Sequence, residues 1–184
     1  MTPEDSSGMY TIRKSLDIDF AHHIRGHAGA CIHIHGHTWR FEVELQAKSL
    51  DEDGFVIDFK RLKTEVLQPC HRLLDHSLAI GADTYAETER ALIPLGQALL
   101  DSRMPRHGTT ETSDSSVTTL AGACNRYPGG MKVVVFPFSP TSERIAKWLY
   151  EVAQDTLGDE RVSVAAARVF ETQKPVPAVA EYRP

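Results

Sequence analysis

The chain lacks long apolar runs and clustered positive charge. No apolar run exceeds four residues, as in Val133–Phe136, and residues 1–8 have neither the basic nor the apolar segment of an export signal. We therefore expect no membrane span and a cytoplasmic protein. The 20 lysines and arginines are scattered among 25 aspartates and glutamates, giving a net charge of −5. This balance argues against a nucleic-acid binder, because such proteins gain affinity by neutralising phosphates.

Cysteine is also scarce. The three cysteines, Cys31, Cys70 and Cys124, are odd in number and widely spaced, so they do not form a disulfide framework and fit a reducing compartment. The remaining composition is ordinary for a globular protein, with 41% hydrophobic and 24% charged residues in 184. A chain of this length can bury its own core, so we expect a single domain over residues 1–184.

Alternating apolar and polar residues predict the strands. Met9–Phe20 alternates loosely and Thr38–Gln46 cleanly, which is typical of strands with one face on a core. The core face of the second strand is predicted to carry Trp39, Phe41, Val43 and Leu45. Val162–Phe170 alternates again, and a short strand at Val179–Tyr182 follows it. On the third strand one face is predicted to carry Val162, Val164, Ala166 and Phe170.

Two helices are predicted between these strands. Asp58 is a candidate N-cap for the first helix, and Pro69 is expected to end or kink it. Thr141 or Ser142 is expected to cap the second, which Gly158 should stop. Strands and helices in blocks indicate an α+β fold, an antiparallel sheet with two helices packed on one face.

Residues 81–132 differ in character from the rest and are predicted to be an insertion. Ala91–Leu100 has the residues of a short helix. Gly108–Thr119 has eight serines or threonines among twelve residues and no aromatic residue, which favours a surface loop.

Histidine is concentrated between the first two strands. Six of the nine fall within sixteen residues: His22, His23, His27, His33, His35 and His37. Residues two apart on a strand point the same way, so His35 and His37 can present two imidazoles to one point, and Gly36 lets the backbone come close. His22 can complete a three-histidine set, which suits a catalytic Zn²⁺ with an open position. Spacing alone also permits His33 and excludes neither His23 nor His27.

Other residues have weaker signals. Cys31, four residues before His35, is a candidate base or nucleophile, and alternatively a buried structural thiol or a fourth zinc ligand. Asp75 and His76 follow the first helix; we do not expect such neighbours to hydrogen-bond to each other as a relay, although either can reach Cys31 in space. Glu171 is a carboxylate at the end of a late strand.

Taken together, these residues resemble a known set. In chain order the set is His22, Cys31-x-x-x-His35-Gly36-His37, Gly54-x-x-Ile57-Asp58-Phe59-x-x-Leu62-Lys63, Leu74-Asp75-His76, Pro140-Thr141-Ser142-Glu143 and Glu171-Thr172. The chain resembles the 6-pyruvoyltetrahydropterin synthase superfamily. The spacing between Cys31 and His35 is similar to that of the bacterial 6-carboxytetrahydropterin synthases of the queuosine pathway.

The resemblance implies a tunnelling fold whose subunits form a barrel, as trimers that stack into a homohexamer with active sites between subunits. It also implies that His22, His35 and His37 bind Zn²⁺, and His23 is then a bystander. The implied activity is a lyase reaction that converts 7,8-dihydroneopterin triphosphate to 6-carboxy-5,6,7,8-tetrahydropterin, acetaldehyde and triphosphate. A 6-pyruvoyltetrahydropterin synthase, another pterin side-chain lyase and a non-catalytic zinc- or pterin-binding relative are the alternatives.

The resemblance further assigns roles within the site. Cys31 would abstract the proton, Asp75 and His76 would support proton transfer, and Glu171 would both anchor the pterin and join the relay. Thr141 and Ser142 would open the second helix near the pterin. The insertion is longer than in the compact bacterial enzymes, and it offers four cations as candidates for binding the triphosphate: Arg103, Arg106, Arg126 and Lys132.

Overall fold

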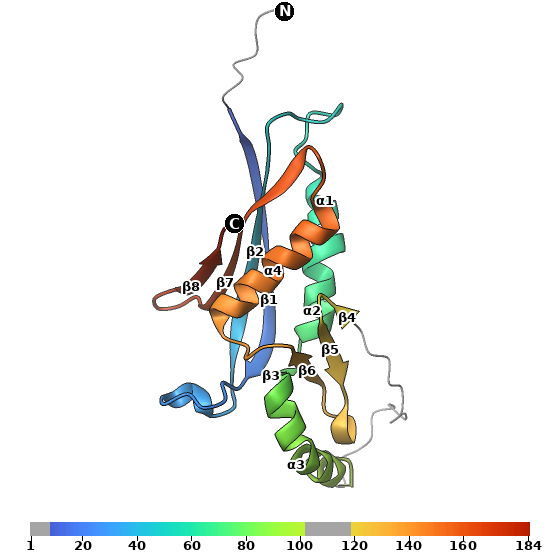
Figure 1. Cartoon of the computed structure of the whole chain (residues 1–184), viewed down its shortest axis with the longest axis vertical. Coiled ribbons are helices and arrows are strands. Elements are labelled where there is room, and N and C mark those ends of the chain that lie inside the picture. Colours follow the sequence, from blue (N-terminus) through green and yellow to red (C-terminus); the bar gives the residue numbers. More distant parts are fainter. Residues whose placement is uncertain (1–7, 102–118) are drawn as a thin grey trace, which may run out of the picture. The chain divides into compact units, whose positions relative to one another are not determined.

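The computed structural model describes residues 8–101 and 119–184 and divides into two compact units (Figure 1). Among the described residues, the first unit comprises 8–18, 38–72 and 142–184, and the second comprises 19–37, 73–101 and 119–141. Strands β1 (Tyr10–His22) and β2 (His35–Ala47) each run from one unit into the other. Within the described ranges, no helix is long and apolar enough to cross a membrane.

The first unit contains the predicted strands. Its strand order is β1-β2-β7-β8, with β7 at Val162–Thr172 and β8 at Ala178–Tyr182. β7 pairs antiparallel with both β2 and β8. The four predicted strand positions are therefore confirmed.

The predicted face of β7 is right for Val162 and Val164 and wrong from Ala166 onward. Glu44 of β2 pairs with Ala166, whereas the next residue of β2 pairs with Val164, so β7 holds one extra residue here. Such a bulge exchanges the two faces of the strand that follows it. Val169 is consequently buried and Phe170 is only partly buried, the reverse of the predicted alternation.

The first predicted helix is present, but Pro69 does not end it. Asp58 caps its start, since its Oδ1 accepts a hydrogen bond from the Lys60 N–H at 2.7 Å. The helix continues as α1 (Phe59–Arg61), a π-helical segment η2 (Leu62–Leu67) and α2 (Gln68–Leu74). Proline lacks an N–H and its ring crowds the preceding turn of an α-helix. The wider π-helical turns directly before Pro69 relieve this conflict, so the helix does not stop.

The second predicted helix, α4 (Ser142–Leu157), covers the sheet of the first unit. It ends just before Gly158, whose N–H donates to the Gln154 carbonyl at 2.9 Å. α4 packs against β7, β8 and η2. The side chains in this core are 0–1% exposed and include Trp39, Phe41, Val43, Leu45, Ile145, Trp148 and Leu149. The core face predicted for β2 is thus confirmed.

The second unit makes the sheet mixed, which corrects the expectation of an antiparallel sheet. Its strand order is β4-β5-β6-β3-β1, with β3 at Leu78–Gly81, β4 at Thr119–Leu120, β5 at Ala123–Arg126 and β6 at Val133–Phe136. β3 pairs parallel with both β1 and β6. Parallel neighbours need a crossover connection, and here both crossovers contain a helix.

The insertion contains a longer helix than predicted. α3 runs from Ala82 to Asp101 rather than over Ala91–Leu100, and Pro94 lies inside it. It packs against β3, β6 and the short helix η3 (Pro128–Gly130). The first turns of α3 are mostly polar. The helix is anchored instead by Leu92, which is buried in a core with Ile80, Val133 and Val135. The predicted Gly108–Thr119 loop lies outside the described residues, apart from Thr119, which begins β4.

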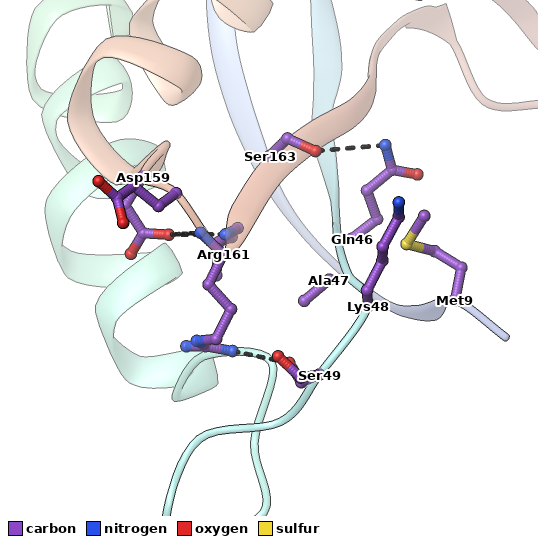
Figure 2. Close-up of a pocket in the computed structure, with 10 residues that line it drawn as sticks. Met9, Gln46, Ala47, Lys48, Ser49, Asp159, Arg161 and Ser163 are labelled. Carbon is purple, nitrogen blue, oxygen red and sulfur yellow. Dashed lines mark hydrogen bonds between the residues drawn. The ribbon is translucent and has the colours of Figure 1, made fainter. Parts of the chain in front are cut away.

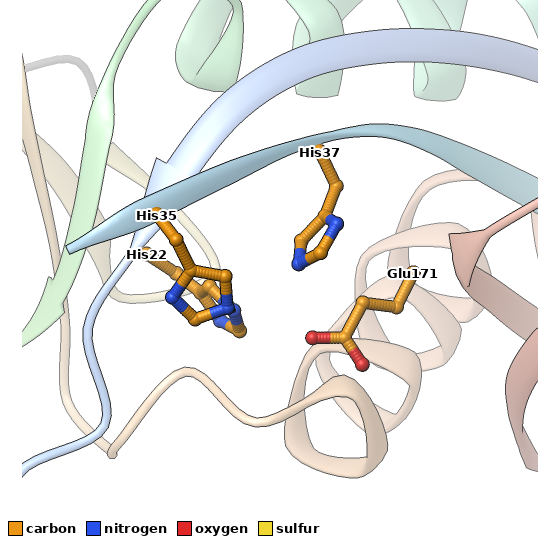
Figure 3. Close-up of side chains that lie close together, drawn as sticks. All are labelled: His22, His35, His37 and Glu171. Carbon is orange, nitrogen blue, oxygen red and sulfur yellow. The ribbon is translucent and has the colours of Figure 1, made fainter. Parts of the chain in front are cut away.

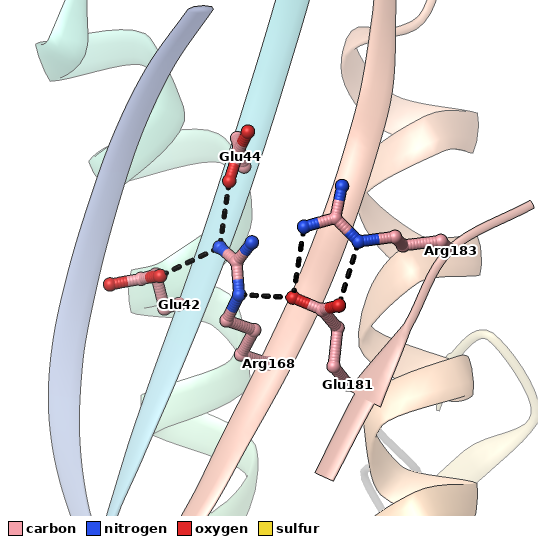
Figure 4. A network of polar contacts seen from close by, with 5 residues as sticks. All are labelled: Glu42, Glu44, Arg168, Glu181 and Arg183. Carbon is pink, nitrogen blue, oxygen red and sulfur yellow. Dashed lines mark hydrogen bonds and ion pairs between the residues drawn. The ribbon is translucent and has the colours of Figure 1, made fainter. Parts of the chain in front are cut away.

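A network of ion pairs joins β2, β7 and β8 in the first unit (Figure 4). The Arg168 guanidinium is only 13% exposed and lies 2.9 Å from a Glu42 oxygen and 2.8 Å from a Glu44 oxygen. It also pairs with Glu181, which Arg183 contacts at 2.7 Å. One guanidinium therefore compensates three carboxylates on adjacent strands.

We expect Arg168→Met to lower the free energy of unfolding by about 3 kcal/mol at pH 7, because carboxylates with little exposure lose their partner. Chemical denaturation measures the change, with Lys147→Met as the control, since Lys147 makes an exposed pair with Glu151. Equal, small losses in both variants would contradict the expectation.

The loss should also depend on pH. Hydrogen bonds from Arg183 and then Arg168 outweigh burial and hold the pKa of Glu181 below its ordinary value of 4.5. A carboxyl with a lowered pKa stabilises the fold above that ordinary value and stops doing so as pH falls through the folded-state pKa. The loss of unfolding free energy in Arg168→Met has a share that comes from the broken pair with Glu181. That share should become smaller when denaturation is measured below about pH 4.5.

Candidate functional site

Three histidines meet where β1 ends and β2 begins, within the second unit (Figure 3). His22 is the last residue of β1, is 1% exposed, and pairs with Ala79 of β3. His35 and His37 are the first and third residues of β2, so they point to the same face of that strand. A Cβ atom at Gly36 would lie 3.4 Å from the Phe20 carbonyl oxygen, at the edge of ordinary van der Waals contact.

The three imidazoles converge closely enough to share one ion. One ring nitrogen from each lies within 4.8 Å of the others. Ring centroids are 4.5 Å apart for His22 and His35, 5.0 Å for His35 and His37, and 5.8 Å for His22 and His37.

Backbone carbonyls fix the proton position on two of these rings. Nδ1 of His22 lies 3.0 Å from the Pro140 carbonyl oxygen, and Nδ1 of His35 lies 2.8 Å from the His33 carbonyl oxygen. A carbonyl only accepts, so each Nδ1 carries the proton and each Nε2 of the neutral ring carries a lone pair. The two Nε2 atoms are nevertheless only 3.0 Å apart.

This arrangement fits a metal ion. Two lone pairs at 3.0 Å repel each other unless a proton or a cation lies beside both. Histidine metal ligands commonly donate the other ring N–H to a carbonyl, which orients the ring, and His22 and His35 both do so. His37 completes a set of three imidazoles, the number found in zinc sites that keep a position open for substrate.

The other histidines of the cluster take different positions. His33 has an exposed side chain and contributes its carbonyl to His35. His27 accepts a hydrogen bond from the Gly29 N–H at 2.9 Å. Burial, followed by the charges of His22 and His35, lowers the pKa of His23.

The cysteines differ in their surroundings. Cys31 lies on a short 3-10 helix, η1 (Ala30–Ile32), between β1 and β2, and its side chain is half-buried. Its carbonyl accepts the Ile24 N–H at 2.9 Å, which closes the loop that carries the thiol. Cys70 is fully buried in α2, where burial raises its pKa to about 12 and makes it unreactive. Cys124 lies on β5, half-buried.

Asp75 and His76 do contact each other, contrary to the expectation for adjacent residues. The Asp75 Oδ2 atom lies 2.8 Å from the His76 Nδ1 atom, and the imidazole is 81% exposed. This contact is possible because His76 has a positive φ of 56°, a conformation that residues other than glycine rarely adopt and that turns the ring back toward Asp75.

The remaining predicted site residues lie near the start of α4. Ser142, in the first unit, donates a hydrogen bond from its hydroxyl to Glu171 Oε2 at 3.1 Å. Glu171 is the second-last residue of β7 and is partly buried. Thr141, in the second unit, donates its N–H to the Ser139 carbonyl at 2.8 Å.

A pocket of about 630 Å³ opens at the end of β2 and the start of β7 in the first unit (Figure 2). It is lined by Met9, Gln46, Ala47, Lys48, Ser49, Asp159, Glu160, Arg161, Val162 and Ser163. The Arg161 guanidinium donates to the carbonyls of Ser49, Phe55 and Val56 at 2.9–3.3 Å. Its charge thus holds a loop together, and none of the predicted site residues lines this pocket.

Comparison with known proteins matches this geometry to a family. A family model described as 6-pyruvoyl tetrahydropterin synthase covers residues 11–184. The chain belongs to the 6-pyruvoyl tetrahydropterin synthase family. The resemblance drawn from the motifs is therefore confirmed.

Named relatives agree with this membership. The 6-carboxy-5,6,7,8-tetrahydropterin synthase of Haemophilus influenzae is 27% identical over 167 residues, which is 89% of this chain and 94% of that protein. The Bacillus subtilis enzyme of the same name is 33% identical over 86 residues, which is 46% of this chain and 56% of that protein.

Solved structures share the fold. An uncharacterised protein from Wolinella succinogenes has a TM-score of 0.66 and 25% identity, with 96% of this chain and 99% of that chain covered. The 6-pyruvoyltetrahydropterin synthase of Plasmodium vivax has a TM-score of 0.54 and 17% identity, with the same coverage. These likenesses support a tunnelling-type fold with a mixed sheet.

Two supporting groups of the site were not predicted from sequence. The carbonyl oxygens of Pro140 and His33, which orient His22 and His35, carry no side-chain signal. Lys132, which the sequence offers as a candidate triphosphate ligand, donates from its ammonium to the Asp75 carbonyl at 2.7 Å.

We expect His35→Ala to lower metal affinity by at least about 100-fold, because one of three converging imidazoles is lost. His33→Ala is the matched control. It removes an exposed imidazole two residues before His35 and keeps the backbone carbonyl that orients His35. Equilibrium dialysis followed by elemental analysis measures bound metal. Stoichiometric metal in His35→Ala would overturn the proposed ligand set.

Proposed function

We propose that this protein is a zinc-dependent lyase that makes 6-carboxy-5,6,7,8-tetrahydropterin. With one water, 7,8-dihydroneopterin triphosphate would yield this product, acetaldehyde and triphosphate. The observation that carries the proposal is the convergence of His22, His35 and His37, with two of the three rings fixed by backbone carbonyls. The relative matched over 94% of its length bears the name of this activity.

Zinc is the metal proposed for the three imidazoles. Neutral nitrogen ligands suit Zn²⁺, and three of them leave a coordination position for substrate. Bound there, the ion supplies a Lewis acid for the hydroxyl oxygens of the substrate side chain. The proposed ligands are His22, His35 and His37, each oriented by the strand or carbonyl described above.

The proton-transfer roles are proposed for three residues. Cys31 removes a proton from the substrate side chain, since a half-buried thiol on a short loop beside β2 can become a thiolate near a cation. Asp75 holds Nδ1 of His76, which leaves Nε2 of the exposed imidazole to exchange protons.

The pterin-binding role is proposed for Glu171. A carboxylate can accept two parallel hydrogen bonds from the N–H and NH₂ groups of a pterin. The Ser142 hydroxyl donates to Oε2 of Glu171 at 3.1 Å, which orients the carboxylate. Thr141, the residue before Ser142, is likewise proposed to contact the pterin.

We further propose a homohexamer with active sites between subunits. Support comes from β8, which is the last strand in the hydrogen-bonded order and exposes Val179 by 52%. An unpaired edge with exposed apolar residues is a template for pairing with another chain. Sedimentation velocity would distinguish a hexamer from a trimer or a monomer.

Turnover of dihydroneopterin triphosphate by the zinc-loaded protein, with products identified by mass spectrometry, tests the function. Carboxytetrahydropterin plus acetaldehyde is the expected result. A pyruvoyl product, or release of the whole side chain, would be compatible with the proposed metal site but would reject this reaction. Absence of turnover would reject the substrate.

We expect Cys31→Ala to lower kcat by at least about 1000-fold while the metal stays bound, because the base is lost but the three imidazoles remain. Cys124→Ala is the control, as it removes a second half-buried thiol. Loss of metal from Cys31→Ala would make Cys31 a ligand instead of a base.

A further inference from the structure

The turn that carries Asp75 and His76 has an unusual backbone. It joins α2 to β3, and His76 within it has a φ of 56°. Two hydrogen bonds brace it: the His76 N–H donates to the Asp19 carbonyl at 2.7 Å, and the Ser77 N–H donates to the Leu74 carbonyl at 3.0 Å. A non-glycine residue keeps a positive φ only where its surroundings enforce it.

Lys132 contacts both ends of this turn. Its Nζ atom donates to the Asp75 carbonyl at 2.7 Å, and its own carbonyl accepts the Leu78 N–H at 3.0 Å. Lys132 directly precedes β6, which pairs with β3 from Leu78 to Gly81. The strand pairing therefore holds the backbone contact in place and fixes the point from which the Lys132 side chain reaches Asp75.

The lysine is also placed for an electrostatic effect. Its side chain is half-buried, and burial lowers its pKa, while the charge of Asp75 opposes that shift. An ammonium beside a carboxylate favours the ionised form of that carboxylate. An ionised Asp75 is the form that accepts the Nδ1–H of His76.

From these contacts we propose that Lys132 is a positioning residue for the Asp75–His76 pair. The inference rests on the proposed function, in which that pair moves protons. The imidazole is 81% exposed, so its direction depends on the Asp75 contact and on the backbone of the turn. Lys132 supports both, because it binds the Asp75 main chain and places a positive charge near the Asp75 side chain.

A direct role in binding the substrate's triphosphate is the competing assignment. An ammonium bound to phosphate contributes to substrate affinity, so its loss would raise KM. A positioning residue affects the orientation of the acid–base pair, so its loss lowers kcat with KM little changed. The two assignments are therefore separated by steady-state kinetics.

The kinetic test uses Lys132→Met, Lys132→Arg and the control Lys147→Met, an exposed lysine on α4. We expect Lys132→Met to lower kcat roughly 10- to 100-fold with KM within about twofold and bound metal unchanged. Lys132→Arg should recover most of kcat, because a guanidinium can still donate to the Asp75 carbonyl. A raised KM at unchanged kcat, or no change at all, would overturn the proposal.

Amide hydrogen exchange tests the turn without any need for turnover. The amides of His76, Ser77 and Leu78 should exchange about tenfold faster in Lys132→Met, while those of α4 stay unchanged. If the wild-type chain shows no activity, the proposed function fails and exchange still decides the role of Lys132 in the turn. Unchanged exchange would reject that role. If Lys132→Met does not fold, Lys132→Gln, which keeps a donor but not the charge, takes its place in both measurements.

Discussion

Two imidazole nitrogens that both carry lone pairs, 3.0 Å apart, need a positive charge beside them. Nε2 of His22 and Nε2 of His35 are in this position because backbone carbonyls hold the protons on the opposite nitrogens. A metal ion bound beside both nitrogens would supply that charge without changing either tautomer. The strand ends, the loop before β2 and the segment after β6 all serve to hold this pair and His37 in place.

Much of this site could be predicted because strand geometry is local. Alternation along β2 places His35 and His37 on one face. The supporting carbonyls could not be predicted in this way. Pro140 lies 118 residues from His22, so its contact depends on the tertiary fold and has no signature in side-chain chemistry.

The fold shows the same division between local and non-local information. The capping of the first helix by Asp58 and the stop of α4 before Gly158 follow from short-range chemistry. The bulge in β7 does not, because it arises from pairing with β2 and reverses the face of Phe170. β6 was not recognised as a strand, because Val133–Phe136 is buried on both faces and so shows no alternation.

The insertion is compatible with the site because of where its ends lie. The chain leaves β3 at Gly81 and returns in β6, and the two strands pair in parallel from Leu78 to Gly81. The closure entropy of a loop rises slowly with its length, so a long segment between paired strands costs little more than a short one. Its last residue, Lys132, contacts the Asp75 turn, and the chain beyond β6 supplies the Pro140 carbonyl to His22. The contacts of the site with Lys132 and Pro140 therefore depend on the register of β6 against β3.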